Sequence, residues 1–212
     1  MFKRVTGLTL VLMVFVLGCK LPGREITPEQ EEKAKQALLA DFEQMLKSHE
    51  TCDLVAFREY HTQKANGAFE ALTKILDPSM LDPKLKDIPL NDRGALWMCT
   101  LAKLAKFNTT EVEPLAVAVN VQNGTAKVFF KWGGTEYGFP MARQNDKWRS
   151  PFPGHVFFVH EYKKWLDTVK ENLPDDQARN DFPDQLAHVI KLLTPFQPNW
   201  AEFPEMKSDD SD

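Results

Sequence analysis

The sequence predicts an α+β fold with N-terminal helices, an antiparallel β-meander of three to four strands and C-terminal helices. Apolar residues recur at helical spacing before residue 107 and after residue 158. Between residues 114 and 150 they alternate instead with small or polar residues, and turn signals separate the runs. The 15 Phe and 5 Trp of this 212-residue chain supply a core for one domain.

The first expected helix covers residues 28–48. Thr27 is a good N-cap, Pro28 stands at the first helical position, and Gln30 follows the cap by three residues. Its apolar stripe consists of Leu38, Phe42, Met45 and Leu46.

A second helical region is expected after Asp53 and extends to Leu76, with Asn66-Gly67 as the place where it would divide. Residues 77–92 contain three prolines and predict a loop. Residues 93–107 return to helical spacing.

Four alternating runs predict the strands, which are residues 114–122, 125–132, 135–143 and the shorter 147–152. The turn signals between them are Asn123-Gly124, Gly133-Gly134 and Asn145-Asp146. Pro140 cannot donate a backbone hydrogen bond, so it places the third strand at an edge or a bulge.

Two helices are expected to close the domain. The first carries Phe158, Tyr162, Trp165, Leu166, Val169 and Leu173, and the second carries Phe182, Leu186, Val189, Ile190 and Leu193. Residues 195–212 form a proline- and aromatic-rich arm with an acidic tail, which either packs over the domain or waits for a partner.

The chain begins with a basic segment followed by a short apolar run. Lys3 and Arg4 precede an 11-residue run from Gly7 to Leu17, shorter than the roughly 20 residues that a membrane-spanning helix needs. Such an arrangement is typical of an export signal.

The run ends in Val16-Leu17-Gly18-Cys19, which resembles the lipobox of bacterial lipoproteins. The resemblance implies cleavage before Cys19, a diacylglycerol on its thiol and attachment to the membrane through lipid. The alternative is an ordinary secretory signal with a chance cysteine. The expected organisation is a signal peptide (1–18), a lipidated tether (19–26), one α+β domain (27–194) and the arm (195–212).

Removing residues 1–18 takes away Lys3 and Arg4, which leaves 24 basic and 30 acidic residues and a net charge of −6. This balance argues against nucleic-acid binding, which depends on neutralising phosphates. The resemblance implies location in a bacterial cell envelope. Lys20 stands where enterobacterial lipoproteins that stay in the inner membrane often carry Asp, which favours the outer membrane.

Cys52 and Cys99 are the cysteines left after Cys19. Their single intramolecular pairing would close a loop of about 48 residues and contribute ~4 kcal/mol on the chain-entropy estimate. The alternative is two separate buried thiols.

The motif search assigns no catalytic residue, metal site or cofactor. The sequence has no Gly-x-Ser-x-Gly elbow and no phosphate-binding glycine loop. The histidines have no metal-binding spacing, so surface or core positions are expected for His49, His61, His155, His160 and His188.

Five aromatic residues of the expected strands form the candidate site: Phe130, Trp132, Tyr137, Phe139 and Trp148. They either form the core or surround a hydrophobic pocket with polar Tyr and Trp tips. The helix at 28–48 and the strands at 114–150 also resemble, faintly, the cystatin-like cone of nuclear-transport-factor-like proteins. That resemblance implies a curved sheet around a long helix, with a pocket between them.

The sequence therefore favours a non-enzymatic, membrane-anchored envelope domain that binds a protein partner or a small apolar ligand. Two alternatives stay open. One is an enzyme that uses scattered acids or histidines in a cone-shaped pocket, and the other is an envelope-assembly factor that uses the C-terminal arm.

Overall fold

A computed structural model describes residues 26–74, 76, 78–152 and 162–205. The expected signal peptide, Cys19, most of the tether, Phe158, His155, His160 and the acidic tail lie outside the described residues. Within these ranges the fold is α+β in the expected order, with N-terminal helices, a four-stranded antiparallel sheet and C-terminal helices.

Helix α1 (Pro28–Thr51) is the longest helix described. Thr27 and Gln30 form a reciprocal capping box at its start, and Cys52 ends it in the left-handed conformation with φ 54°. Its buried stripe consists of Ala34, Leu38, Phe42, Met45 and Ser48. These positions are three or four residues apart, so they share one face of the helix.

The sheet has the strand order β1-β2-β3-β4, made by β1 (Glu113–Asn120), β2 (Thr125–Trp132), β3 (Thr135–Gln144) and β4 (Lys147–Arg149). β4 pairs only with residues 142–144 of β3, so Pro140 lies beyond its reach. Pro140 therefore needs no donor on that side, although β3 is an inner strand of the sheet and not the expected edge strand.

The first hairpin turn differs from the expected one. β1 ends at Asn120, which is opposite Thr125, so the loop has four residues rather than two. The Asn120 side chain accepts a hydrogen bond from the Asn123 backbone N–H at 3.1 Å. Gly124 then adopts φ 63°, a conformation that glycine enters at little cost.

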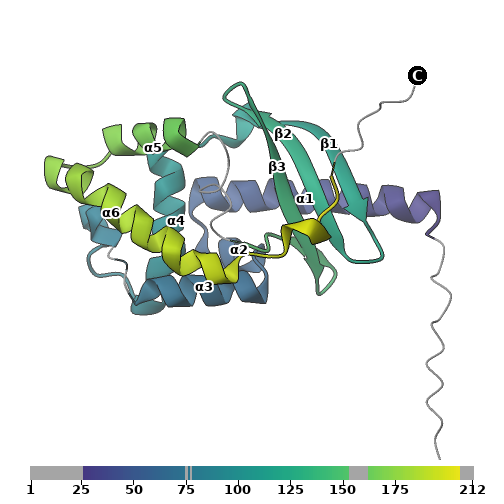
Figure 1. Ribbon diagram of the computed structural model, residues 1–212, viewed down its shortest axis with the longest axis horizontal. Coiled ribbons are helices and arrows are strands. Elements are labelled where there is room, and N and C mark those ends of the chain that lie inside the picture. Colours follow the sequence, from purple (N-terminus) through teal and green to yellow (C-terminus); the bar gives the residue numbers. More distant parts are fainter. Residues whose placement is uncertain (1–25, 75, 77, 153–161, 206–212) are drawn as a thin grey trace, which may run out of the picture.

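The sheet lies between α1 and the C-terminal arm (Figure 1). One face of β2 packs against α1 through Ala126, Val128 and Phe130. On the other face the Thr125 hydroxyl donates to the Glu202 backbone oxygen, and Lys127 pairs with Glu205 at 2.7 Å. The described part of the arm therefore packs over the domain, which is one of its two expected arrangements.

The remaining helices form a second hydrophobic cluster beside the sheet (Figure 1). They are α2 (Leu54–Glu59), α3 (Gln63–Thr73), α4 (Arg93–Leu104), α5 (Tyr162–Glu171) and α6 (Asp176–Leu193). Trp132 borders both this cluster and the one between α1 and the sheet.

The division between α2 and α3 falls at residues 60–62, so the expectation of a break at Asn66-Gly67 is wrong. Thr62 caps α3 by accepting from the Ala65 N–H, and its own N–H donates to the Ser150 backbone oxygen at 2.9 Å. Asn66 instead donates from its side chain to the carbonyl of Arg58. The end of β4 thus draws the chain out of helical geometry, a tertiary contact that local sequence does not encode.

Gly94 allows α4 to approach α3 closely. A Cβ at this position would lie 2.2 Å from the Phe69 backbone oxygen, whereas a Cβ at Gly67 in α3 would meet nothing within 4 Å.

We expect Gly94→Ala to lower the free energy of unfolding by about 2–3 kcal/mol, because the helices must separate to admit the methyl group. Gly67→Ala is the matched control and should raise stability by about 0.5–1 kcal/mol, since alanine loses less backbone entropy in a helix. Urea denaturation followed by circular dichroism measures both. Equal effects of the two variants would contradict the close approach.

Candidate functional site

A groove of about 640 Å³ opens between the first half of α1 and the ends of two hairpins. We call it the α1 groove. Five of its lining residues are apolar, and we call them the floor: Ile26, Ala34, Ala37, Val121 and Trp148. Its rim is polar and consists of Gln30, Lys33, Gln122, Arg143 and Asp146. This volume and this mixture are those of small-molecule sites, which have ~300–1,000 Å³ and a few polar groups around an apolar lining.

The groove exists because α1 carries small side chains where it passes the hairpin ends. Ala34 and Ala37 face this space, whereas Leu38, Phe42 and Met45 fill the interval between α1 and the sheet further along. The side chains on this part of α1 are therefore small near its start and large further along. The two alanines leave the space that forms the groove.

The sheet side of the groove is fixed by a contact between β4 and α1. The Trp148 backbone N–H donates to Asp41 Oδ2 at 2.8 Å, and the Trp148 side chain is almost fully buried. Arg143 pairs with Trp148 across β3 and β4, so both belong to the sheet face that looks towards α1. Backbone pairing and the Asp41 contact thus hold Trp148, whereas Val121 belongs to the loop between β1 and β2.

The rim carries two cations and one carboxylate, a net charge of +1 on a chain that is acidic overall. Arg143 Nη2 lies 3.3 Å from Asp146 Oδ1, in a pair whose side chains are 43% and 95% exposed. Such an exposed pair contributes little energy, so Arg143 can readily exchange it for a ligand anion.

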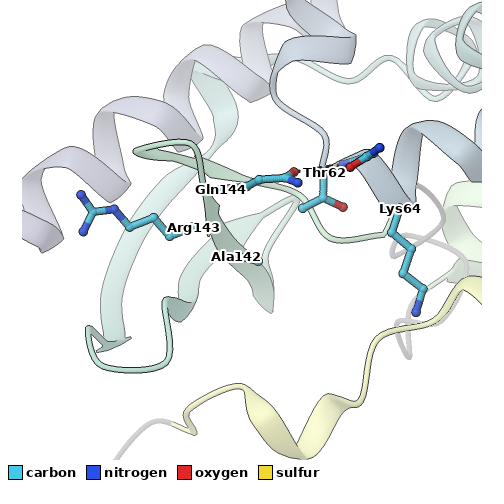
Figure 2. A pocket seen from close by; sticks show the side chains of 6 residues that line it. Thr62, Lys64, Ala142, Arg143 and Gln144 are labelled. Carbon is cyan, nitrogen blue, oxygen red and sulfur yellow. Dashed lines mark hydrogen bonds between the residues drawn. The ribbon is translucent and has the colours of Figure 1, made fainter. Parts of the chain in front are cut away.

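A second hollow of about 570 Å³ lies on the other side of the β3 end, between Thr62–Lys64 and Ala142–Gln144. It is wide open, and its polar groups are already engaged. The Gln63 N–H donates to Gln144 Oε1, and the Lys64 ammonium donates to the Gln197 backbone oxygen. Figure 2 shows Arg143 extending away from Thr62 and Lys64, towards α1. Arg143 therefore lines both hollows, and its side chain extends towards the α1 groove.

The five aromatic residues expected to form a core or a pocket all lie on or near the sheet face that packs against α1. Phe130 stacks on Tyr137 at 5.4 Å, and Phe42 of α1 lies 5.5 Å from Phe130 and 5.7 Å from Phe139. Trp132 contacts Phe107 at 5.3 Å. Trp148 is the member of the set that the α1 groove includes.

A buried histidine pair lies at the other end of α1. The His49 and His61 rings stack at 5.3 Å, and Phe57 lies 4.5 Å from each. His61 Nδ1 is 2.6 Å from the Phe57 backbone oxygen, so this nitrogen carries the proton and donates it. His49 Nε2 is buried with no hydrogen-bond partner within the described part of the chain.

This environment favours neutral imidazoles. Burial lowers the pKa of His61 to about 4, against a smaller opposing effect of its hydrogen bond to Phe57. Burial also lowers the pKa of His49 well below its ordinary value, and the adjacent His61 ring lowers it further. The pair therefore resists protonation, and its burial suits a structural joint better than a site open to substrate.

The structure joins Cys52 and Cys99 in a disulfide, with Cα atoms 5.5 Å apart. This distance is typical of disulfides. The bond ties the end of α1 to α4, next to the histidine pair. His188, the other histidine described, is exposed on α6.

The sequence interpretation missed most of the groove. Lys33 is expected on a solvated helix face and Asp146 in a turn, and Arg143 is expected at an alternating position of the third strand with no binding role; Ala34 and Ala37 are not singled out. The available signal was the change from alanine to large apolar residues along the α1 stripe, together with the cationic Arg143 at an inward position of β3.

No family model matches the chain, and neither a curated protein nor a solved structure was found that resembles it. The resemblances to lipoproteins and to the cystatin-like cone therefore stay predictions. Within the residues described, no helix is long and apolar enough to cross a bilayer. The same residues contain no group of three or more His, Cys, Asp or Glu side chains that could hold a metal ion.

We expect stability to decrease as the pH falls from about 6.5 to about 4. The pKa of His61 is lowered on folding, so in this window the unfolded chain binds a proton that the folded chain does not. A shift of this size corresponds to about 3 kcal/mol. Urea denaturation at pH 7.5 and pH 4 measures the loss.

His61→Gln should reduce this pH dependence while it lowers stability at neutral pH. His188→Gln removes an exposed histidine and should leave the pH dependence as in the wild type. A wild-type slope in the His61 variant would show that other groups cause the acid sensitivity.

Proposed function

We infer that the chain is a lipid-anchored protein of a bacterial envelope, and that its domain is a non-enzymatic binding module whose site is the α1 groove. The observation that carries this proposal is the position of the groove. Ile26, which forms part of the floor, follows Cys19 by only seven residues. An extended segment of that length reaches ~25 Å at most, so the groove would lie close to the bilayer.

The anchor is supported by the basic start, the short apolar run and the lipobox-like residues that end at Cys19. Two or three acyl chains would hold the protein at the surface, because each buried CH₂ contributes ~0.8 kcal/mol.

The binding role is supported by the lining of the groove. Its titratable side chains are Lys33, Arg143 and Asp146, at an open rim where they can recognise charge. Partner binding through the C-terminal arm would first require its release from the sheet, because Phe203 is buried and Glu202 and Glu205 are bonded to β2.

The anchor predicts the covalent state of the protein in the envelope. Extracted protein should begin at Cys19 and carry acyl chains, whereas Cys19→Ser should be neither acylated nor cleaved at this site because it lacks the acceptor thiol. Intact-mass spectrometry and palmitate labelling measure both. Cys52→Ser is the control and should stay acylated. An unacylated wild-type protein would contradict the anchor.

The binding role predicts a bound molecule. Native mass spectrometry of the envelope protein should show additional mass that is lost on denaturation. Ala37→Trp fills the groove and should lose this mass, whereas Leu39→Trp enlarges an exposed residue on the opposite side of α1 and should keep it. A wild-type chain without added mass, or added mass that persists in Ala37→Trp, would contradict binding in the groove.

A further inference from the structure

We propose that the α1 groove binds a fatty acid from the adjacent bilayer, with the carboxylate at Arg143 and Lys33 and the acyl chain on the apolar floor. This inference rests on the proposed binding role, and it adds the chemical class of the ligand and the residues that select it.

The first argument is that both apolar and charged groups line one groove. Ala34, Ala37 and Trp148 belong to the floor, whereas Lys33 and Arg143 belong to the rim. A ligand that fits both parts has an apolar body and a charged end. Trp148 is 2% exposed and its backbone is held by Asp41, so the floor is formed before the ligand arrives.

The second argument is charge complementarity. With two cations and Asp146, the rim has a net charge of +1, which one carboxylate neutralises. Arg143 presents a planar fork that binds a carboxylate through two parallel hydrogen bonds. Its pair with Asp146 is exposed and separated by 3.3 Å, so the guanidinium is available to a ligand. Lys33 is exposed on α1, across the groove from the hairpin that carries Arg143.

The third argument is the access route. Ile26 lines the groove and follows Cys19 by seven residues, so a lipid on Cys19 would lie within ~25 Å of this lining residue. A lipid anchor on Cys19 would hold the groove near a bilayer, which is a source of single-chain amphiphiles. A volume of about 640 Å³ accommodates a ligand with one acyl chain whose head lies at the rim.

The test uses the mature chain without lipid, residues 19–212 with Cys19→Ser, at pH 8. All described helices and strands lie between residues 28 and 202, so this chain retains them. Calorimetric titration with dodecanoate, at concentrations where it is monomeric, should show one site. Dodecyltrimethylammonium has the same chain length with a cationic head and should bind at least tenfold more weakly. Lysophosphatidylglycerol, an anionic lipid with a larger head, should also bind more weakly than dodecanoate.

Two kinds of variant test recognition of the ligand's carboxylate and of its acyl chain separately. Lys33→Gln with Arg143→Gln should weaken dodecanoate at least tenfold and abolish the preference over the cationic amphiphile. Lys47→Gln with Lys131→Gln removes two exposed lysines outside the groove lining. It should change neither the dodecanoate affinity nor the preference for dodecanoate over the cationic amphiphile. Ala37→Trp should eliminate binding of every amphiphile, and Leu39→Trp should leave it intact. Circular dichroism establishes that each variant is folded.

Three results would overturn the inference: equal binding of the two dodecyl compounds, an unchanged dodecanoate affinity in the double Gln variant, or a preference for lysophosphatidylglycerol. If Ala37→Trp eliminates binding but anionic and cationic amphiphiles bind equally well, the groove is a binding site and the assignment to fatty acids fails. If no amphiphile binds while the envelope protein carries another groove-dependent ligand, the binding role stands alone. If neither is found, both proposals fail.

Discussion

The packing of α1 against the sheet is the interaction on which the rest of the structure depends. Leu38, Phe42 and Met45 are nearly inaccessible to solvent and fill the concave side of the meander. Asp41 accepts a hydrogen bond from the backbone of β4, which fixes the position of the sheet along the helix. The same helix continues beyond the sheet to the α2–α4 region, where the Cys52–Cys99 bond holds its end (Figure 1). One helix therefore packs on the sheet and is bonded to α4, while Trp132 borders both hydrophobic clusters.

Small and large side chains of α1 make different contributions to stability. Large side chains in its middle bury apolar area, which is the main favourable contribution to folding. Small side chains in its first turns give up part of that contribution and leave a groove. A protein can retain such a groove only if the neighbouring contacts hold the fold without it, and here the capping box at Thr27, the Asp41 contact and the buried Trp148 fulfil this role.

The two ends of α1 have different chemistry. The groove lies near its N-terminus, and the neutral His49–His61 pair lies near its C-terminus with the disulfide. A helix of 24 residues is about 36 Å long, so these regions are well separated. Burial at the joint between α1 and α2 lowers the pKa of His61 to about 4, so the folded state favours the neutral imidazole there.

Local sequence determined the helix starts and most of the turn positions, because caps and turn residues act on their immediate neighbours. Thr27 with Gln30 started α1, and Gly133-Gly134 and Asn145-Asp146 turned the strands, as expected. Alternation also assigned the inward face of β2 correctly. The break at residues 60–62 was decided by the tertiary structure, because Thr62 is held by the distant Ser150. The groove was decided in the same way, since its floor and rim come from segments more than 80 residues apart and a cavity depends on what fails to fill it.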